Sequence, residues 1–189
     1  AAELQAEAVA FVEQSDPSPK GKAQAIQGRL ALGGHYAMAR DFERAKAELD
    51  RAIHDLEAQG DSAGLAAAYR KLAEVERERP DFKAAAAAYG RAIDAYDALK
   101  ACTKPDSAKN AAETMRNLGR LLMEQLSDSA RAKPAFLKAR ACGDDKVREA
   151  SLLCDLAEAA RRRGLFDEAT GYVEEARKLA TQIKRPELE

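Results

Sequence analysis

The chain has 189 residues, of which 46% are apolar but only 5% aromatic, and it contains no tryptophan. Its 31 basic and 32 acidic residues are interspersed and leave a net charge of −1, which argues against bulk attraction to nucleic acid or to a membrane surface. No apolar run approaches the roughly 20 residues that a membrane-spanning helix needs. Alanine, leucine, glutamate, lysine and arginine dominate, so the composition predicts an all-α protein.

A short N-terminal helix is predicted over residues 3–14, with apolar residues on one face: Leu4, Ala8, Phe11 and Val12. Two prolines and a glycine in the stretch 15–21 should end this helix, because these residues cannot continue it. Residues 1–22 are therefore assigned to an N-terminal helix and linker. This segment is either a cap or the remnant of an earlier repeat.

The next stretch has the pattern of two amphipathic helices joined by a tight turn. Gly33 lies one helical turn before Tyr36, and the second helix carries Ala45, Leu49 and Ala52 on one face. Small residues in such a stripe let two helix axes approach closely, while the larger ones fill the gaps. The pattern recurs three times, and its markers follow one another at intervals of 40, 46 and 38 residues: Gly33, Ala73, Gly119 and Ala157.

A period of this length, built from helix–turn–helix units, predicts an α-solenoid. We assign four repeats, followed by a tail that is expected to include vector-derived residues: 23–62, 63–107, 108–145, 146–185 and the tail 186–189. The third repeat is irregular, because one extra residue separates its helices and Ser127-Asp128-Ser129 replaces an aromatic turn. Pro134 is expected in the first turn of its second helix, where a missing N–H costs least.

The repeats resemble a known family at the following positions: Leu32, Gly33, Tyr36, Ala45, Leu49 and Ala52, the turns 41–45 and 164–169, Asn117-Leu118-Gly119, and Phe136. With them, the chain resembles the tetratricopeptide repeat (TPR) family over about residues 23–183. The resemblance implies a right-handed superhelix of eight repeat helices, with first helices lining the concave side. Glu76 and Ala160 depart from the family pattern, since they stand where a bulky residue is usual.

No sequence motif indicates catalysis. The chain has no phosphate loop, no paired-histidine zinc motif and no nucleophile elbow. Its two histidines, His35 and His54, are predicted to lie on different surfaces. We therefore expect no enzymatic activity, no catalytic residue, no metal site and no cofactor.

A concave groove is the remaining candidate site. The resemblance places eight candidate binding residues on its wall: Leu30, Met38, Arg70, Arg77, Arg116, Asn117, Arg120 and Arg161. Arginine presents a planar fork that suits carboxylates, and asparagine can hold the backbone of an extended peptide. The competing interpretation of these residues is a solvated face with internal pairs such as Arg70–Glu74 and Arg120–Glu124.

The leading hypothesis is a non-enzymatic protein–protein interaction scaffold, which binds a peptide or helical segment of acidic character. Neither nucleic acid nor membrane insertion is expected. The alternative is a regulatory or oligomerisation segment of a larger protein, which packs on its own domains or self-associates with a second copy. A small-ligand sensor is a third option, although no closed aromatic pocket is visible in the sequence.

Three cysteines, at positions 102, 142 and 154, are too few for a disulfide framework. The first expectation is three free thiols in the cytoplasm. Cys102 and Cys142 both follow the second helix of a repeat, so they can share one edge of the molecule. A bridge between them, in an exported protein, is the alternative.

Overall fold

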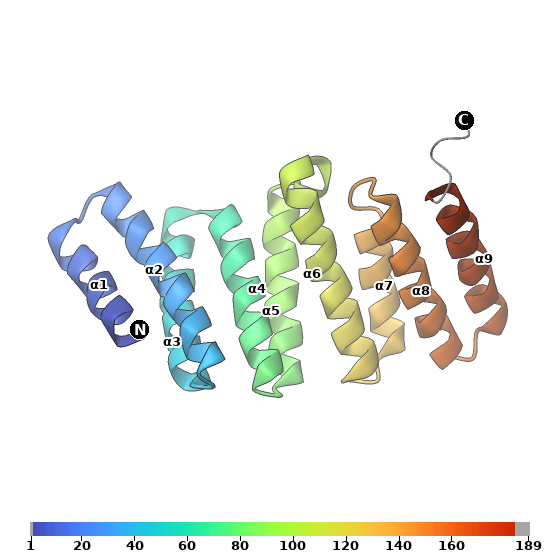
Figure 1. Cartoon of the computed structure of the whole chain (residues 1–189), viewed down its shortest axis with the longest axis horizontal. Helices are drawn as coiled ribbons and strands as arrows, with labels where there is room; N and C mark the ends of the chain where they lie inside the picture. Colours follow the sequence, from blue (N-terminus) through green and yellow to red (C-terminus); the bar gives the residue numbers. More distant parts are fainter. Residues whose placement is uncertain (1, 184–189) are drawn as a thin grey trace. The chain divides into compact units, whose positions relative to one another are not determined.

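The computed structural model describes residues 2–183, and over this range it holds nine α-helices, one short 3₁₀ helix and no strand. The all-α prediction is thus confirmed. The chain divides into two compact units, Ala1–Leu99 and Lys100–Glu189 (Figure 1). The predicted tail, 186–189, lies outside the described residues.

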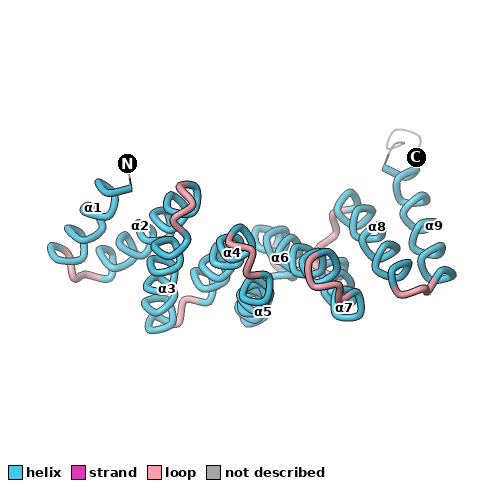
Figure 2. Tube along the Cα trace, turned by 90° about the horizontal axis from the view of Figure 1, so that it is seen from below, coloured by secondary structure: helices cyan, strands magenta, loops and turns pink. Residues whose placement is uncertain are grey.

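Unit 1 contains five helices in chain order: α1 (Ala2–Ser15), α2 (Pro19–Met38), α3 (Phe42–Gln59), α4 (Ser62–Glu78) and α5 (Phe82–Ala98). Unit 2 contains the 3₁₀ helix and four helices: η1 (Ala101–Thr103), α6 (Pro105–Glu124), α7 (Ser129–Arg140), α8 (Lys146–Arg162) and α9 (Phe166–Ile183). Within each unit, every helix packs against the next one along the chain. Short loops join them, as the pink segments of Figure 2 show.

Aspartate side chains begin most of these helices. Each accepts a hydrogen bond from a backbone N–H three residues later, which satisfies one of the free donors of the first helical turn. The capping residues are Asp41, Asp61, Asp81, Asp128 and Asp145. The regular loops therefore follow directly from the sequence.

Close helix packing occurs at the glycine markers. A Cβ added to Gly33 would lie 2.8 Å from the Leu49 Cγ, and one added to Gly119 would lie 2.5 Å from the Phe136 ring. Both partners are completely buried. The glycines thus permit the first and second helices of a repeat to approach more closely than any side chain would allow.

Repeat 3 differs from its prediction at Pro134. Four residues separate α6 from α7, against three in the other helix–turn–helix pairs, so the extra residue is present. However, Asp128 caps α7 at Ser129, which places Pro134 in the second turn rather than the first. The prediction of a first-turn proline was wrong. The helix tolerates it because Pro134 and Ala130, whose carbonyl loses its donor, are both exposed to solvent.

The N-terminal segment also differs from the prediction. Ser18 caps α2, and Pro19 occupies its first turn, so the linker is shorter than predicted. In α1, Val9 is the buried residue, and it faces Gly28 of α2. The predicted apolar face was wrong in part, because Leu4 and Phe11 are exposed.

Candidate interaction surface

Four arginines gather on α6 and α8 of unit 2, where they share two carboxylates. Arg116 and Arg120 of α6 both bind Asp155 of α8. We call these three residues, together with Glu158, Arg161 and Arg162 of α8, the arginine cluster. Four guanidinium groups face two carboxylates, so the cluster has a net charge of +2.

Asp155 joins the two helices. Its Oδ2 accepts a hydrogen bond from Arg116 Nε at 2.5 Å, and its Oδ1 accepts one from Arg120 Nε at 3.1 Å. Asp155 is buried, and a buried carboxylate requires such charged partners to offset its desolvation. Arg120 therefore pairs with a residue of another helix and not with Glu124, as the competing interpretation had it.

Glu158 orders the second pair of arginines. Arg161 binds it through two hydrogen bonds of 2.7 and 2.8 Å, and Arg162 binds it at 2.6 Å. These hydrogen bonds lower the pKa of Glu158 to about 2. Since its folded pKa is depressed, the ion pairs persist at neutral pH and are lost only as the pH falls from 4.5 towards 2.

Exposure within the cluster leaves it accessible to a partner. The Arg120 and Arg161 side chains are 49% and 62% exposed. Arg162 also donates from Nη1 to the carbonyl of Met123 at 2.9 Å, which links the C-terminal part of α8 to α6. The guanidinium groups are thus held in place on a surface that a ligand can reach.

The other predicted residues have different environments. Leu30 is buried in the core of unit 1 with Ile26 and Leu49, so it is not available to a partner, because α2 turns this position towards α3. Met38 is 75% exposed at the end of α2. Asn117 is half-buried on α6, beside Arg116.

Arg70 and Arg77 lie on α4, in unit 1, and thus not in the unit that holds the arginine cluster. Arg70 is half-buried, and its Nε is enclosed without a hydrogen bond, whereas Arg77 is exposed. Of the predicted residues, Arg116 and Arg120 share Asp155 as their partner, while Arg161 pairs with Glu158 on the same helix as Asp155.

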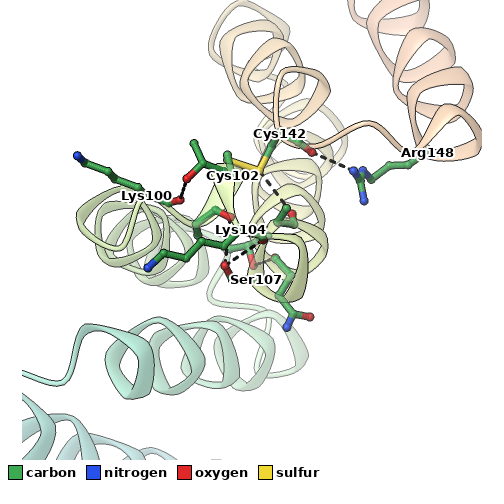
Figure 3. Close-up of a disulfide and its surroundings, with 11 residues drawn as sticks. Lys100, Cys102, Lys104, Ser107, Cys142 and Arg148 are labelled. Carbon is green, nitrogen blue, oxygen red and sulfur yellow. Dashed lines mark hydrogen bonds between the residues drawn. A yellow bond between two sulfur atoms is a disulfide. The ribbon is translucent and has the colours of Figure 1, made fainter.

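A disulfide anchors the N-terminal end of α6 (Figure 3). Cys102 of η1 is bonded to Cys142 of the α7–α8 loop, with Cα atoms 4.5 Å apart. The expectation of three free thiols was wrong for this pair, because η1 packs on α6 and the Cys142 sulfur lies 3.4 Å from the Ala108 carbonyl oxygen of α6. Cys154 is free and exposed.

Hydrogen bonds fix the same region from both sides of the disulfide, as Figure 3 shows. Arg148 of α8 donates to the Cys142 carbonyl at 2.9 Å, and Ser107 of α6 donates to the Ala101 carbonyl at 3.1 Å. The first turns of α6 and α8 are therefore connected through η1 and the α7–α8 loop. This connection helps to set the register in which Asp155 meets both arginines.

The analysis of the sequence placed Asp155 and Arg162 on the same helix face as Arg161 but did not include them among the eight candidates. It did not recognise Asp155 as the shared partner of Arg116 and Arg120. The available signal was the spacing of Arg116 and Arg120, one turn apart on α6. Using it requires knowledge that α6 and α8 are adjacent, which only the repeat architecture supplies.

Solved structures provide the comparison with known proteins. BtubC (BKLC) from P. vanneervenii matches with a TM-score of 0.76 and 17% identity, covering 97% of this chain and 73% of that one. A putative kinesin light chain from Podosopora anserina with nearly identical TPR-like repeats matches at 0.73 and 15% identity, over 97% and 87% of the two chains. MamA matches at 0.66 and 20% identity, over 95% and 88%.

The chain folds as a TPR-type repeat protein. The likeness of the TPR-type fold to these structures concerns architecture, since the identities are low. No family model and no curated protein matches the sequence significantly. Among the described residues, no helix is long and apolar enough to cross a membrane.

Proposed function

We propose that this TPR-type chain is a non-enzymatic protein-interaction scaffold, whose unit 2 binds an acidic segment of a partner at the arginine cluster. The observation that carries the proposal is the excess of guanidinium groups over carboxylates on a partly exposed face of α6 and α8. Helical repeat arrays commonly use such surfaces to bind peptides. The excess charge would attract acidic partners and repel basic ones.

Arginine geometry supports this choice of ligand. Arg116 uses its Nε for Asp155, and Arg161 uses its Nε and Nη2 for Glu158. Remaining N–H donors can bind ligand carboxylates, and such charge-assisted bonds are roughly twice as strong as neutral ones. Asn117, next to Arg116, offers an amide that can pair with a peptide backbone.

The disulfide bears on the compartment in which this binding would occur. Disulfides persist in oxidising compartments and are rare where thioredoxin and glutathione keep thiols reduced. The Cys102–Cys142 bond therefore favours the exported alternative over the cytoplasm.

The test uses fluorescein-labelled peptides and fluorescence anisotropy. The probe is a 14-residue peptide of glutamate and leucine, and its control carries glutamine in place of glutamate. We expect only the acidic peptide to bind, and the double variant Arg120→Gln/Arg161→Gln to weaken binding at least tenfold, since charged hydrogen bonds contribute about 1.5–3 kcal/mol each. The fold should persist because Arg116 still pairs with the buried Asp155 and the Arg161 side chain is exposed.

The matched control is Arg131→Gln on α7. Its side chain is exposed and pairs with Asp128, which lies outside the arginine cluster. It should bind the acidic peptide as the unchanged chain does. If the acidic and the glutamine peptide bound equally well, the cluster would not recognise carboxylates. The same conclusion would follow if Arg131→Gln weakened binding as much as Arg120→Gln/Arg161→Gln.

A further inference from the structure

A cavity of about 420 Å³ lies beside the disulfide of unit 2, where η1, the first turns of α6 and the start of α8 meet. This volume falls within the range of about 300–1,000 Å³ that is usual for sites of small molecules. One half of the disulfide, Cys102, belongs to its wall, together with four charged side chains: Lys109, Asp144, Asp145 and Arg148. A small molecule in this cavity therefore meets a disulfide and charges of both signs.

The two sulfurs of the disulfide differ in access. Cys102 is half-buried and lines the cavity, whereas Cys142 is completely buried and is not among the described residues of the wall. In thiol–disulfide exchange a thiolate attacks one sulfur and expels the other, so access decides which cysteine is attacked. A thiol in this cavity can reach Cys102, and Cys142 is then the leaving group.

The surroundings of Cys142 suit a sulfur that has been released. Its sulfur lies 3.4 Å from the Ala108 carbonyl oxygen, but in the disulfide it carries no hydrogen to donate to this acceptor. Arg148 Nη2 donates to the Cys142 carbonyl at 2.9 Å, which holds a positive charge next to the residue that becomes a thiolate (Figure 3). After protonation, the Cys142 thiol can donate to Ala108. The opened disulfide thus has a hydrogen-bond partner in place.

The charges of the cavity indicate which thiol it suits. Asp145 caps α8 and lies 3.8 Å from Arg148 Nη1, so these two side chains already interact with each other. Lys109 and Asp144 are exposed, and neither side chain pairs with another side chain in the described part of the chain. One free ammonium and one free carboxylate on the same wall complement a ligand that carries both charges.

We propose that this cavity binds a small zwitterionic thiol, which exchanges with the disulfide and forms a mixed disulfide at Cys102. The ligand thiolate attacks the Cys102 sulfur, so that a new S–S bond forms while the bond to Cys142 breaks. The proton of the incoming thiol goes to solvent, and the Cys142 thiolate takes one up, so the step needs no other oxidant or reductant. The ligand carboxylate pairs with Lys109 and its ammonium with Asp144.

The first experiment follows the opening of the disulfide at rising concentrations of L-cysteine. The Cys154→Ser chain is used, because Cys154 is a free and exposed thiol that would exchange as well. Binding in the cavity should give a rate that reaches a plateau at millimolar thiol, whereas attack from bulk solvent gives a linear rise. Cysteamine, with an ammonium alone, and 3-mercaptopropionate, with a carboxylate alone, should show no plateau in this range.

Peptide mapping by mass spectrometry locates the attacked sulfur. Samples are quenched with acid during the reaction, and free thiols are then alkylated in denaturant. We expect the added cysteine mainly on Cys102 and the alkyl group on Cys142, because only Cys102 lines the cavity. Circular dichroism during the reaction checks that the chain remains folded.

Variants test the charges of the wall. Lys109→Gln and Asp144→Asn should each lower the exchange rate at low cysteine concentration about threefold, the effect of losing one exposed ion pair. Lys109→Gln should leave the rate with cysteamine unchanged. The matched control is Lys104→Gln, since Lys104 is exposed and is not among the described residues of the wall. It should react with cysteine as the parent chain does.

Several outcomes would overturn the proposal. A disulfide that stays closed in the folded chain, or a rate that rises linearly with cysteine, excludes a thiol site in the cavity. Added cysteine found mainly on Cys142 excludes Cys102 as the attacked sulfur. Equal effects of Lys109→Gln and Lys104→Gln exclude recognition of the carboxylate. None of these results depends on the arginine cluster, so they do not affect the peptide-binding proposal.

Discussion

Glu76 is a carboxylic acid that the core of unit 1 buries. It lies on α4 at 3% exposure, its Oε2 has no hydrogen-bond partner, and the Arg79 Nε lies 3.5 Å away. Burial raises the pKa of Glu76, with smaller contributions from Asp81 and Asp50, although Arg79 and Lys46 oppose the shift. The sequence analysis noted Glu76 because it stands where the family pattern has a bulky residue. A carboxylate buried at this position lowers the stability of the fold.

The first prediction concerns the pH dependence of stability. A carboxyl with a raised folded pKa binds more protons in the folded chain, so the free energy of unfolding falls as the pH rises from 4.5 through the folded pKa. Glu76→Gln should stabilise the chain by roughly 1 kcal/mol at pH 7.5. At pH 4 the gain should nearly vanish, because the glutamate is protonated.

Thermal unfolding at both pH values measures this effect. Glu74→Gln, a half-buried neighbour on α4, is the control and should change little. An equal gain at pH 4 and pH 7.5 would mean that ionisation of Glu76 is not the cause.

At the scale of elements, the glycine markers set the distance between paired helices. The second prediction compares Gly33→Ala with Gly90→Ala, both within helices of unit 1. The new methyl at position 33 would lie 2.8 Å from Leu49 and 3.3 Å from the Ala45 carbonyl oxygen, whereas no atom lies within 4 Å at position 90.

Chemical denaturation should show that Gly33→Ala lowers the free energy of unfolding by about 1–2 kcal/mol. Gly90→Ala should gain about 0.5–1 kcal/mol from helix propensity. A gain in both variants would contradict the close-approach role of Gly33.

At the scale of the whole molecule, the third prediction separates the two units. The disulfide joins cysteines 40 residues apart within unit 2, and closing a loop of that length stabilises a fold by up to about 4 kcal/mol. Reduction with a phosphine should therefore increase hydrogen exchange in residues 100–183 and leave residues 2–99 nearly unchanged. Cys102→Ser should reproduce the result, whereas Cys154→Ser should not. Equal acceleration in both units would show that they do not unfold separately.

Much of the fold could be predicted from the sequence. Helix periodicity, the small residues at Gly33 and Gly119, and the aspartates before most of the helices are local properties, and they indicate helix–turn–helix repeats without knowledge of any neighbour. Pro134 shows where local reasoning fails, because the cap at Asp128 decided where α7 begins.

The candidate site was predictable only in part. Periodicity assigns residues to the faces of a helix but does not say which neighbour covers a face, and for that reason Leu30 proved buried while Phe166 is exposed. Pairing depends on the register between helices far apart in the sequence. That register, fixed near the disulfide by contacts among η1, α6 and α8, decides that Arg116 and Arg120 meet on Asp155. The sequence alone thus determined the repeat architecture through local periodicity, and only the tertiary structure decided which charges remain for a partner.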